Sequence, residues 1–225
     1  MTEEFSVTHP GRSLSWSKTW IMALTQPSEA SYAEIANDPS ATQDKAYIWI
    51  FISSLIGSIV SLVLYNLFES PLMAPGEEGL FGGSMFVYLL CCAPIGSLLS
   101  VLGTIISVGI TQWIASLLGG TGSYSELIYV VAAYSAPLAL IVSPFTAIPC
   151  LGCLTIPLAL YAALLNIIAV KTVNKFSWGQ AVAASLIIPV LFIGVAIIII
   201  FVLSLLGPTV GNIFSNIIQD LESVP

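Results

Sequence analysis

Four cysteines are the residues of this chain that are best suited to chemistry. Cys150 and Cys153 form a CxxC pair in a short turn between two apolar segments, and Cys91 and Cys92 are adjacent in an earlier segment. Near the oxidising side of a membrane, such a pair can form a disulfide or exchange electrons with other thiols. Cysteine also serves as a small buried apolar residue. The sequence therefore leaves three uses open: a disulfide between Cys150 and Cys153, a thiol oxidoreductase, and packing.

Few other side chains are suited to catalysis or metal binding. The single histidine, His9, lies in a polar N-terminal stretch, so the apolar segments contain no imidazole. Glu126 follows Ser123 by three residues where an apolar segment begins, which is the spacing of a capping box; the alternative is a binding carboxylate. Asn166 lies inside an apolar segment, and we expect it to bond to a neighbouring helix rather than to a substrate. We predict no catalytic residue, no cofactor and no metal.

Two further groups of side chains are candidates for polar contacts. Tyr129, Tyr134 and Tyr161 fall in apolar segments, where a tyrosine packs through its ring and needs a partner for its hydroxyl. Lys171 and Lys175 follow the fourth apolar segment and form the main basic loop. The candidate polar or interaction positions are therefore Glu126, Tyr134, Asn166, Lys171 and Lys175.

The elements that position these residues must lie in a membrane. Of the 225 residues, 57% are hydrophobic and 8% are charged, and water could not solvate the surface of such a chain. A net charge of −7 with five basic residues argues against nucleic acid, which is bound by neutralising its phosphates. The first forty residues contain no signal-peptide pattern, so the first span should direct insertion. We expect membrane lipids and other membrane proteins, or a second copy, as partners.

Five apolar runs are long enough to cross a hydrocarbon layer as helices. They cover residues 46–68, 84–118, 124–147, 152–170 and 178–206. The second run is so long that it must tilt, protrude or bend near Pro94. With five spans and the N-terminus inside, all five basic residues face the cytoplasm, as the positive-inside rule requires. We therefore predict an all-α bundle in the inner membrane, with the N-terminus in the cytoplasm and the C-terminus outside.

Three further patterns complete the predicted architecture. Residues 1–45 form a cytoplasmic segment with two short amphipathic helices, residues 46–206 form the membrane domain, and residues 207–225 form an amphipathic helix on the outer face. On the second span, small residues follow one helix face at a spacing that lets another backbone approach. This stripe, which we expect to be the central packing seam, consists of Gly96, Ser100, Gly103, Ser107 and Thr111.

A diffuse pattern of residues runs along most of the chain. It consists of Trp20, Leu24, Pro27 and the segments 32–35, 124–127, 132–138, 160–161, 165–170 and 176–181. In this pattern the chain resembles the Yip1 family as found in bacteria. The resemblance implies a five-helix membrane domain with a cytoplasmic N-terminus. Eukaryotic members are associated with Rab GTPases and vesicle traffic, but their Asp-Leu-Tyr-Gly-Pro signature is missing here, so the resemblance does not extend to a Rab partner. For bacterial relatives the resemblance implies a fold rather than a reaction.

Three functional hypotheses fit these observations. The first is a non-catalytic membrane protein that organises or binds other membrane components, in one version as an accessory subunit of a larger complex. It rests on plentiful packing residues and few reactive ones. The second is a thiol-disulfide oxidoreductase that uses Cys150 and Cys153. The third is a small transporter or channel lined by Gln112, Glu126 and Asn166, although the chain has few charges within its spans and no internal repeat.

Overall fold

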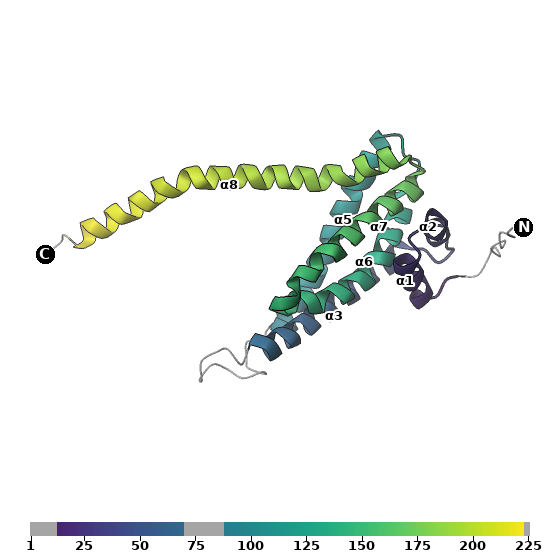
Figure 1. Ribbon diagram of the computed structural model, residues 1–225, viewed down its shortest axis with the longest axis horizontal. Helices are drawn as coiled ribbons and strands as arrows, with labels where there is room; N and C mark the ends of the chain where they lie inside the picture. Colours follow the sequence, from purple (N-terminus) through teal and green to yellow (C-terminus); the bar gives the residue numbers. More distant parts are fainter. Residues whose placement is uncertain (1–12, 70–87, 223–225) are drawn as a thin grey trace, which may run out of the picture. The chain divides into compact units, whose positions relative to one another are not determined.

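The chain folds almost entirely into helices. The computed structural model describes residues 13–69 and 88–222, which contain no strand (Figure 1). Two short helices, α1 (Trp16–Thr25) and α2 (Glu29–Ala36), come first. The long helices are α3 (Gln43–Glu69), α5 (Ala93–Leu117), α6 (Tyr124–Ala147), α7 (Thr155–Asn174) and α8 (Trp178–Glu222). The predicted all-α class is confirmed.

Five of these helices are long and apolar enough to cross a membrane, which confirms the predicted number. The candidate spans are Gln43–Tyr65, Tyr88–Leu117, Tyr124–Ala147, Leu151–Asn174 and Trp178–Gly207. Helices satisfy their own backbone hydrogen bonds, which is the condition for crossing lipid. Residues 84–87 of the predicted second span lie outside the described residues.

α6 forms the core of the bundle. The first half of this helix is buried on all sides, and α1, α2, α3, α5 and α7 all contact it. Its start is fixed by the predicted capping box: Ser123 Oγ accepts from the Glu126 N–H at 3.3 Å, and the Glu126 carboxylate accepts from the Ser123 N–H at 3.0 Å. These bonds satisfy N–H groups that a helix end leaves without partners. In this structure Glu126 acts as a cap.

The irregularity expected near Pro94 is a change of helix type. A π-helical turn, η2 (Tyr88–Cys92), leads directly into α5, and Pro94 falls in the first turn of α5. Proline has no N–H to donate, and the first turn of a helix is where that loss matters least. The second span therefore begins with a single π turn, which is the usual form of π helix inside longer helices.

The structure differs from the expected boundary after residue 206. The chain divides into two compact units, residues 1–185 and 186–225. In the first unit the opening turns of α8 are packed, with Ala181 and Ala184 fully buried. In the second, α8 continues through Gly207 and Pro208 to Glu222 without a break. A proline inside a helix removes one backbone bond, and this helix accommodates it. A separate amphipathic helix on the outer face stays a prediction.

Within residues 1–185, no neighbour packs against the glycines of the predicted seam on the second span. Gly96, Gly103 and Ser107 are exposed, and no atom lies within 4 Å of the place where a Cβ would stand on either glycine. Thr111 alone of the five stripe residues is buried. The small size of a side chain permits close packing, but the approach of a neighbour decides which face is used. The buried face of α5 consists of Ala93, Ser97, Val108, Thr111, Gln112 and Ala115.

The closest helix packing occurs between α3 and α6 instead. Ser53, Gly57 and Ser61 recur at a spacing of four on α3, and this face lies against α6. A Cβ on Gly57 would stand 3.3 Å from the Cβ of Ser143, and Ser61 Oγ donates to the Ser143 carbonyl at 2.9 Å. Small residues at this spacing are typical of close helix pairs in membranes. Within residues 1–185 the close contact between small residues is therefore on the first span, and the seam on the second span stays a prediction.

Candidate functional site

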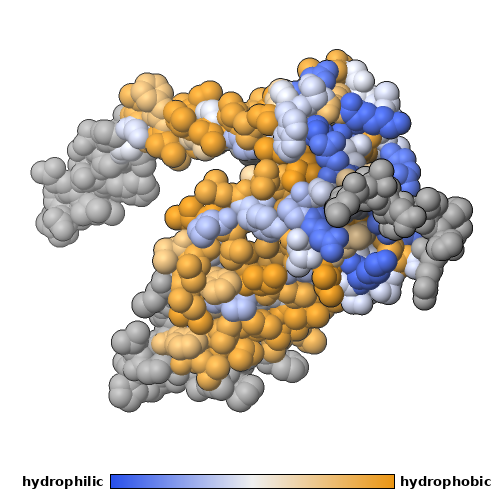
Figure 2. Space-filling view, turned by 45° about the vertical axis from the view of Figure 1, so that its right-hand side comes forward, coloured by the Kyte–Doolittle hydropathy of each residue, from blue (hydrophilic) through white to orange (hydrophobic). Residues whose placement is uncertain are grey.

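Polar side chains gather at the end of the bundle that α1 and α2 cover. Figure 2 shows hydrophilic residues on this side and apolar residues over most of the remaining visible surface of the bundle. The end comprises residues 13–42, the turn 118–123 and the segment 171–180, and we name it the α1–α2 end. It carries Lys171 and Lys175, two of the predicted interaction positions.

Lys171 joins α2 to α7. Only 9% of this lysine is exposed, its Nζ forms a salt bridge with the Glu29 carboxylate, and it lies 4.4 Å from the centre of the Trp178 ring. A lysine buried to this degree needs a carboxylate or an aromatic face as partner, and here it has both. Because Glu29 is half exposed, solvent screens the pair, and its contribution to stability is modest. Lys171 therefore acts as a clamp on α2.

Charge reversal at Glu29 should loosen α2. The Glu29→Lys variant places a second cation beside the buried Lys171 and removes its carboxylate partner, and we expect α2 to be cleaved faster in limited proteolysis of the detergent-solubilised protein. Glu34→Lys is the matched control, since Glu34 lies on the same helix and no salt bridge to it is present among the described residues. Equal cleavage of the two variants would contradict the role of Lys171 as a clamp.

Two tyrosine hydroxyls satisfy the C-terminal end of α1. Tyr32 Oη donates to the Ala23 carbonyl at 3.0 Å, and Tyr161 Oη of α7 donates to the Leu24 carbonyl. The last carbonyls of a helix have no partner within the helix, so these bonds fix α1 to its neighbours. Burial raises the pKa of Tyr32 well above its ordinary value, and Tyr134 and Tyr161 raise it further. Tyr32 therefore stays protonated and remains a donor.

Asn166 makes the kind of contact expected for an amide within a span. Tyr134 Oη of α6 donates to Asn166 Oδ1 of α7 at 3.1 Å. The ring of Tyr134 also stacks on that of Tyr32, with 6.5 Å between ring centres. An interhelical hydrogen bond in a membrane bundle contributes roughly 1 kcal/mol. Two of the predicted interaction positions are thus brought together, and in this structure both hold helices to each other.

An aromatic cluster attaches α1 to the transmembrane bundle. Trp49 of α3 is 1% exposed, and its ring meets Trp16 and Trp20 edge to face at 5.7 and 5.9 Å. On the other side Tyr129 of α6 lies 5.0 Å away, measured between ring centres. Aromatic pairs in such geometries contribute beyond the area that they bury. No local pattern in the sequence links Trp49 to Trp16 and Trp20, because these residues lie far apart along the chain.

An amide pair joins the second and fourth spans. Gln112 Nε2 donates to Asn174 Oδ1 at 3.0 Å and to the Gly122 carbonyl at 2.7 Å, while Asn174 Nδ2 donates to Gln112 Oε1 at 3.2 Å. Both amides are buried. Each amide therefore satisfies the other, and the turn before α6 is tied to the end of α7. Gln112 was a candidate lining residue of a transporter, and here its hydrogen bonds are used in packing.

Lys175 ends α7 in a conformation that favours glycine. Its φ is 55°, in the left-handed region, and its N–H bonds to the Lys171 carbonyl as a helix C-cap. Side chains with a Cβ are strained in this region, whereas glycine is not. We expect Lys175→Gly to raise the free energy of unfolding by up to about 1 kcal/mol and Lys175→Val to lower it, both measured by thermal unfolding in detergent. Loss of stability in the glycine variant would contradict this conformation.

The structure describes the side chains of three of the four cysteines. Cys91 and Cys92 are exposed in η2 and form no disulfide, and Cys153 is exposed in the 3-10 turn η3 (Pro149–Leu154). The side chain of Cys150 lies outside the described residues. A disulfide between Cys150 and Cys153 therefore stays a prediction.

The site and the fold together define the class of this protein. Five helices are long and apolar enough to cross a membrane, and the buried polar groups described above hold helices to one another. This arrangement is that of a polytopic α-helical membrane protein. The Yip1 domain profile matches residues 21–207, and the chain therefore belongs to the Yip1 domain family. No curated protein and no solved structure gives a significant match.

Proposed function

We propose that this Yip1 domain protein is a non-catalytic membrane protein that binds other membrane proteins through the outward face of α5. One observation carries the proposal: Gly96, Ser100, Gly103 and Ser107 follow that face, and the space beyond both glycines is open. Such a stripe gives no advantage against lipid chains, which adapt to any apolar surface. It gives a large advantage against a second helix, whose backbone can then approach closely.

The surroundings of the stripe favour a helix as the occupant. Large apolar side chains stand exposed beside the small residues, among them Ile95, Leu99, Leu102 and Ile106. They form ridges beside a shallow groove over the small residues, and packed helices place the ridges of one helix in the grooves of the other. The buried face of α5, which lies beside the stripe and includes Thr111, is already used within the chain. The partner that we propose is therefore a transmembrane helix of a neighbouring polypeptide.

The orientation belongs to the same proposal. Lys18, Lys45, Lys171 and Lys175 all lie on elements that meet at the α1–α2 end. Cytoplasmic loops carry an excess of lysine and arginine, so this end faces the cytoplasm of an inner membrane. The protein then offers a helix surface within the bilayer and a folded polar layer beneath it, which suits an organiser or an accessory subunit.

The test is co-purification from native membranes in a gentle detergent. Wild-type protein should recover a reproducible partner. The double variant Gly96→Leu/Gly103→Leu should lose it, because two leucine side chains fill the groove over the small residues. Ala163→Leu is the matched control, since Ala163 is a small exposed residue on α7. Co-expression of two differently tagged copies shows whether the partner is the same chain. Recovery that is equal in both variants would overturn the proposal.

A further inference from the structure

A groove rich in hydroxyl groups lies between α3 and α6. It encloses about 400 Å³, and none of its lining residues is charged. Its hydroxyls come from Ser53, Ser54, Ser58 and Ser61 of α3, from Ser143 and Thr146 of α6, and from Tyr88 of η2 at its edge. Both helices belong to the candidate spans, so the groove lies at membrane depth. Polar groups there are costly to keep unless they bind something.

Most of these hydroxyl groups already donate a hydrogen bond to a backbone carbonyl. Ser58 donates to the Ser54 carbonyl at 2.8 Å and Thr146 donates to the Ser143 carbonyl at 2.8 Å. Ser143 donates to the Leu140 carbonyl at 3.1 Å. That carbonyl lacks its usual helical partner, because residue 144 is a proline without an N–H. A hydroxyl that donates keeps its lone pairs, so the groove is a surface of hydrogen-bond acceptors.

Ser53 carries a hydroxyl in this groove that forms no hydrogen bond with the described residues. This residue is 1% exposed, it lines the groove, and its Oγ has no hydrogen-bond partner in the structure. A buried hydroxyl without a partner costs roughly 1 to 3 kcal/mol. It can both donate and accept, which makes it the natural contact for another hydroxyl group.

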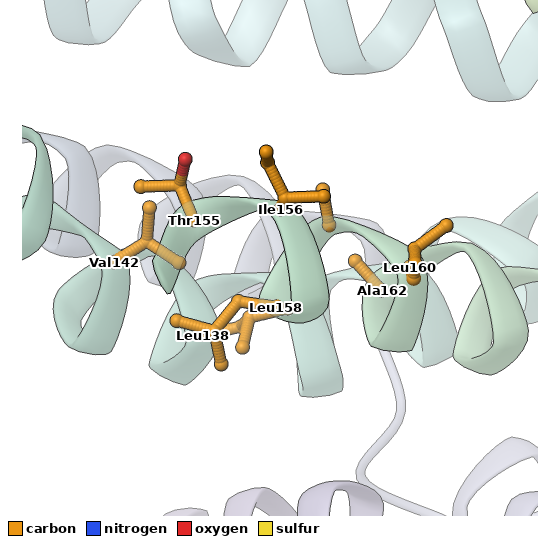
Figure 3. A pocket seen from close by; sticks show the side chains of 8 residues that line it. Leu138, Val142, Thr155, Ile156, Leu158, Leu160 and Ala162 are labelled. Carbon is orange, nitrogen blue, oxygen red and sulfur yellow. The ribbon is translucent and has the colours of Figure 1, made fainter. Parts of the chain in front are cut away.

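An apolar groove adjoins the hydroxyl groove. It encloses about 440 Å³ between α6 and α7, and Val142 belongs to the lining of both grooves. Figure 3 shows the side chains around it, with Leu138 and Leu158 on one side and Ile156 and Leu160 along α7. Its lining is almost entirely apolar, with Thr155 as the exception. The α3–α6–α7 surface therefore offers a polar part and an apolar part next to each other.

We propose that these two grooves bind a neutral lipid whose head carries a free hydroxyl, with diacylglycerol as the representative chemistry. The head would donate to the serine and threonine oxygens and accept from Ser53, and an acyl chain would follow the apolar groove. A phosphate head is disfavoured, because phosphate binding relies on cations and none of the described residues that line the two grooves is charged. The site is separate from the α5 face, so either proposal can fail alone.

The test uses full-length protein in proteoliposomes and a photoactivatable diacylglycerol that carries a click handle. We expect adducts to map to residues 53–61, 138–146 or 155–162. We also expect Ser53→Ala to reduce labelling by about fivefold, which is the effect of one lost hydrogen bond. Ser116→Ala is the control, because it removes an exposed hydroxyl from the end of α5, outside both proposed surfaces, and its labelling should match that of the wild type.

A stability measurement and a competition measurement test the same proposal. Without the probe, Ser53→Ala should be at least as stable as the wild type, since it removes a hydroxyl without a partner. Unlabelled diacylglycerol should compete with the probe, and its O-acetylated form should not. Equal labelling of Ser53→Ala and wild type, adducts confined to other segments, or equal competition by phosphatidylglycerol would each overturn the proposal.

Discussion

Replacing Gly122 by alanine is expected to destabilise the bundle by about 2 kcal/mol or more. A Cβ at this position would stand 2.5 Å from the Val173 carbonyl oxygen and 2.6 Å from its Cγ1. One of these contacts is backbone, which cannot move aside cheaply. The Gly122 carbonyl also accepts from Gln112 Nε2, so any shift of the turn weakens the amide pair as well. Denaturant or thermal unfolding of the purified protein measures the loss.

The matched variant is Gly103→Ala on the exposed face of α5. No atom lies within 4 Å of its Cβ position, and alanine is the better helix former by about 1 kcal/mol. We therefore expect unchanged or slightly higher stability. The same substitution has opposite consequences at the two glycines only if the turn before α6 is packed and the stripe is open. Equal losses would contradict this placement of the second span.

Trp49→Ala is expected to cost about 3 to 5 kcal/mol and to release α1. Trp49 is almost fully buried and forms the centre on which Trp16, Trp20 and Tyr129 converge. Its removal leaves a cavity between α1, α3 and α6, and closely packed helices cannot readily move together to fill it. The unfolding midpoint and the rate of proteolysis within α1 should both change.

Trp113→Ala is the control for the loss of a tryptophan. Trp113 belongs to α5 and is 64% exposed, so its replacement removes little packing within the chain. We expect its effect on the unfolding midpoint to be small and the proteolysis of α1 to stay unchanged. Trp49→Ala with intact, protected α1 would show that the short N-terminal helices are held by other contacts.

Local rules predicted much of this fold. The five spans follow from the length of the apolar runs, and the capping box at Ser123 and Glu126 is present as its spacing indicated. The two short helices expected within residues 1–45 are also present. These features depend on residues close in sequence, where hydrophobic length and helix-end chemistry decide the outcome.

Features that depend on distant residues were predicted less well. The stripe from Gly96 to Thr111 was assigned to the bundle interior, yet three of its members are exposed, because periodicity identifies a face without saying what lies against it. The seam on α3, with Ser53, Gly57 and Ser61, has the same spacing and was overlooked. The left-handed cap at Lys175 gave no signal, since lysine is not typical of that conformation.

The central claim is that the outward face of α5 contacts another helix in the native membrane. A photo-crosslinking amino acid placed at position 103 tests this claim directly, with position 163 on the exposed surface of α7 as the control. The account predicts a discrete protein adduct from position 103 and none from position 163. Adducts with lipid alone at position 103, or the same protein adduct from both positions, would contradict it.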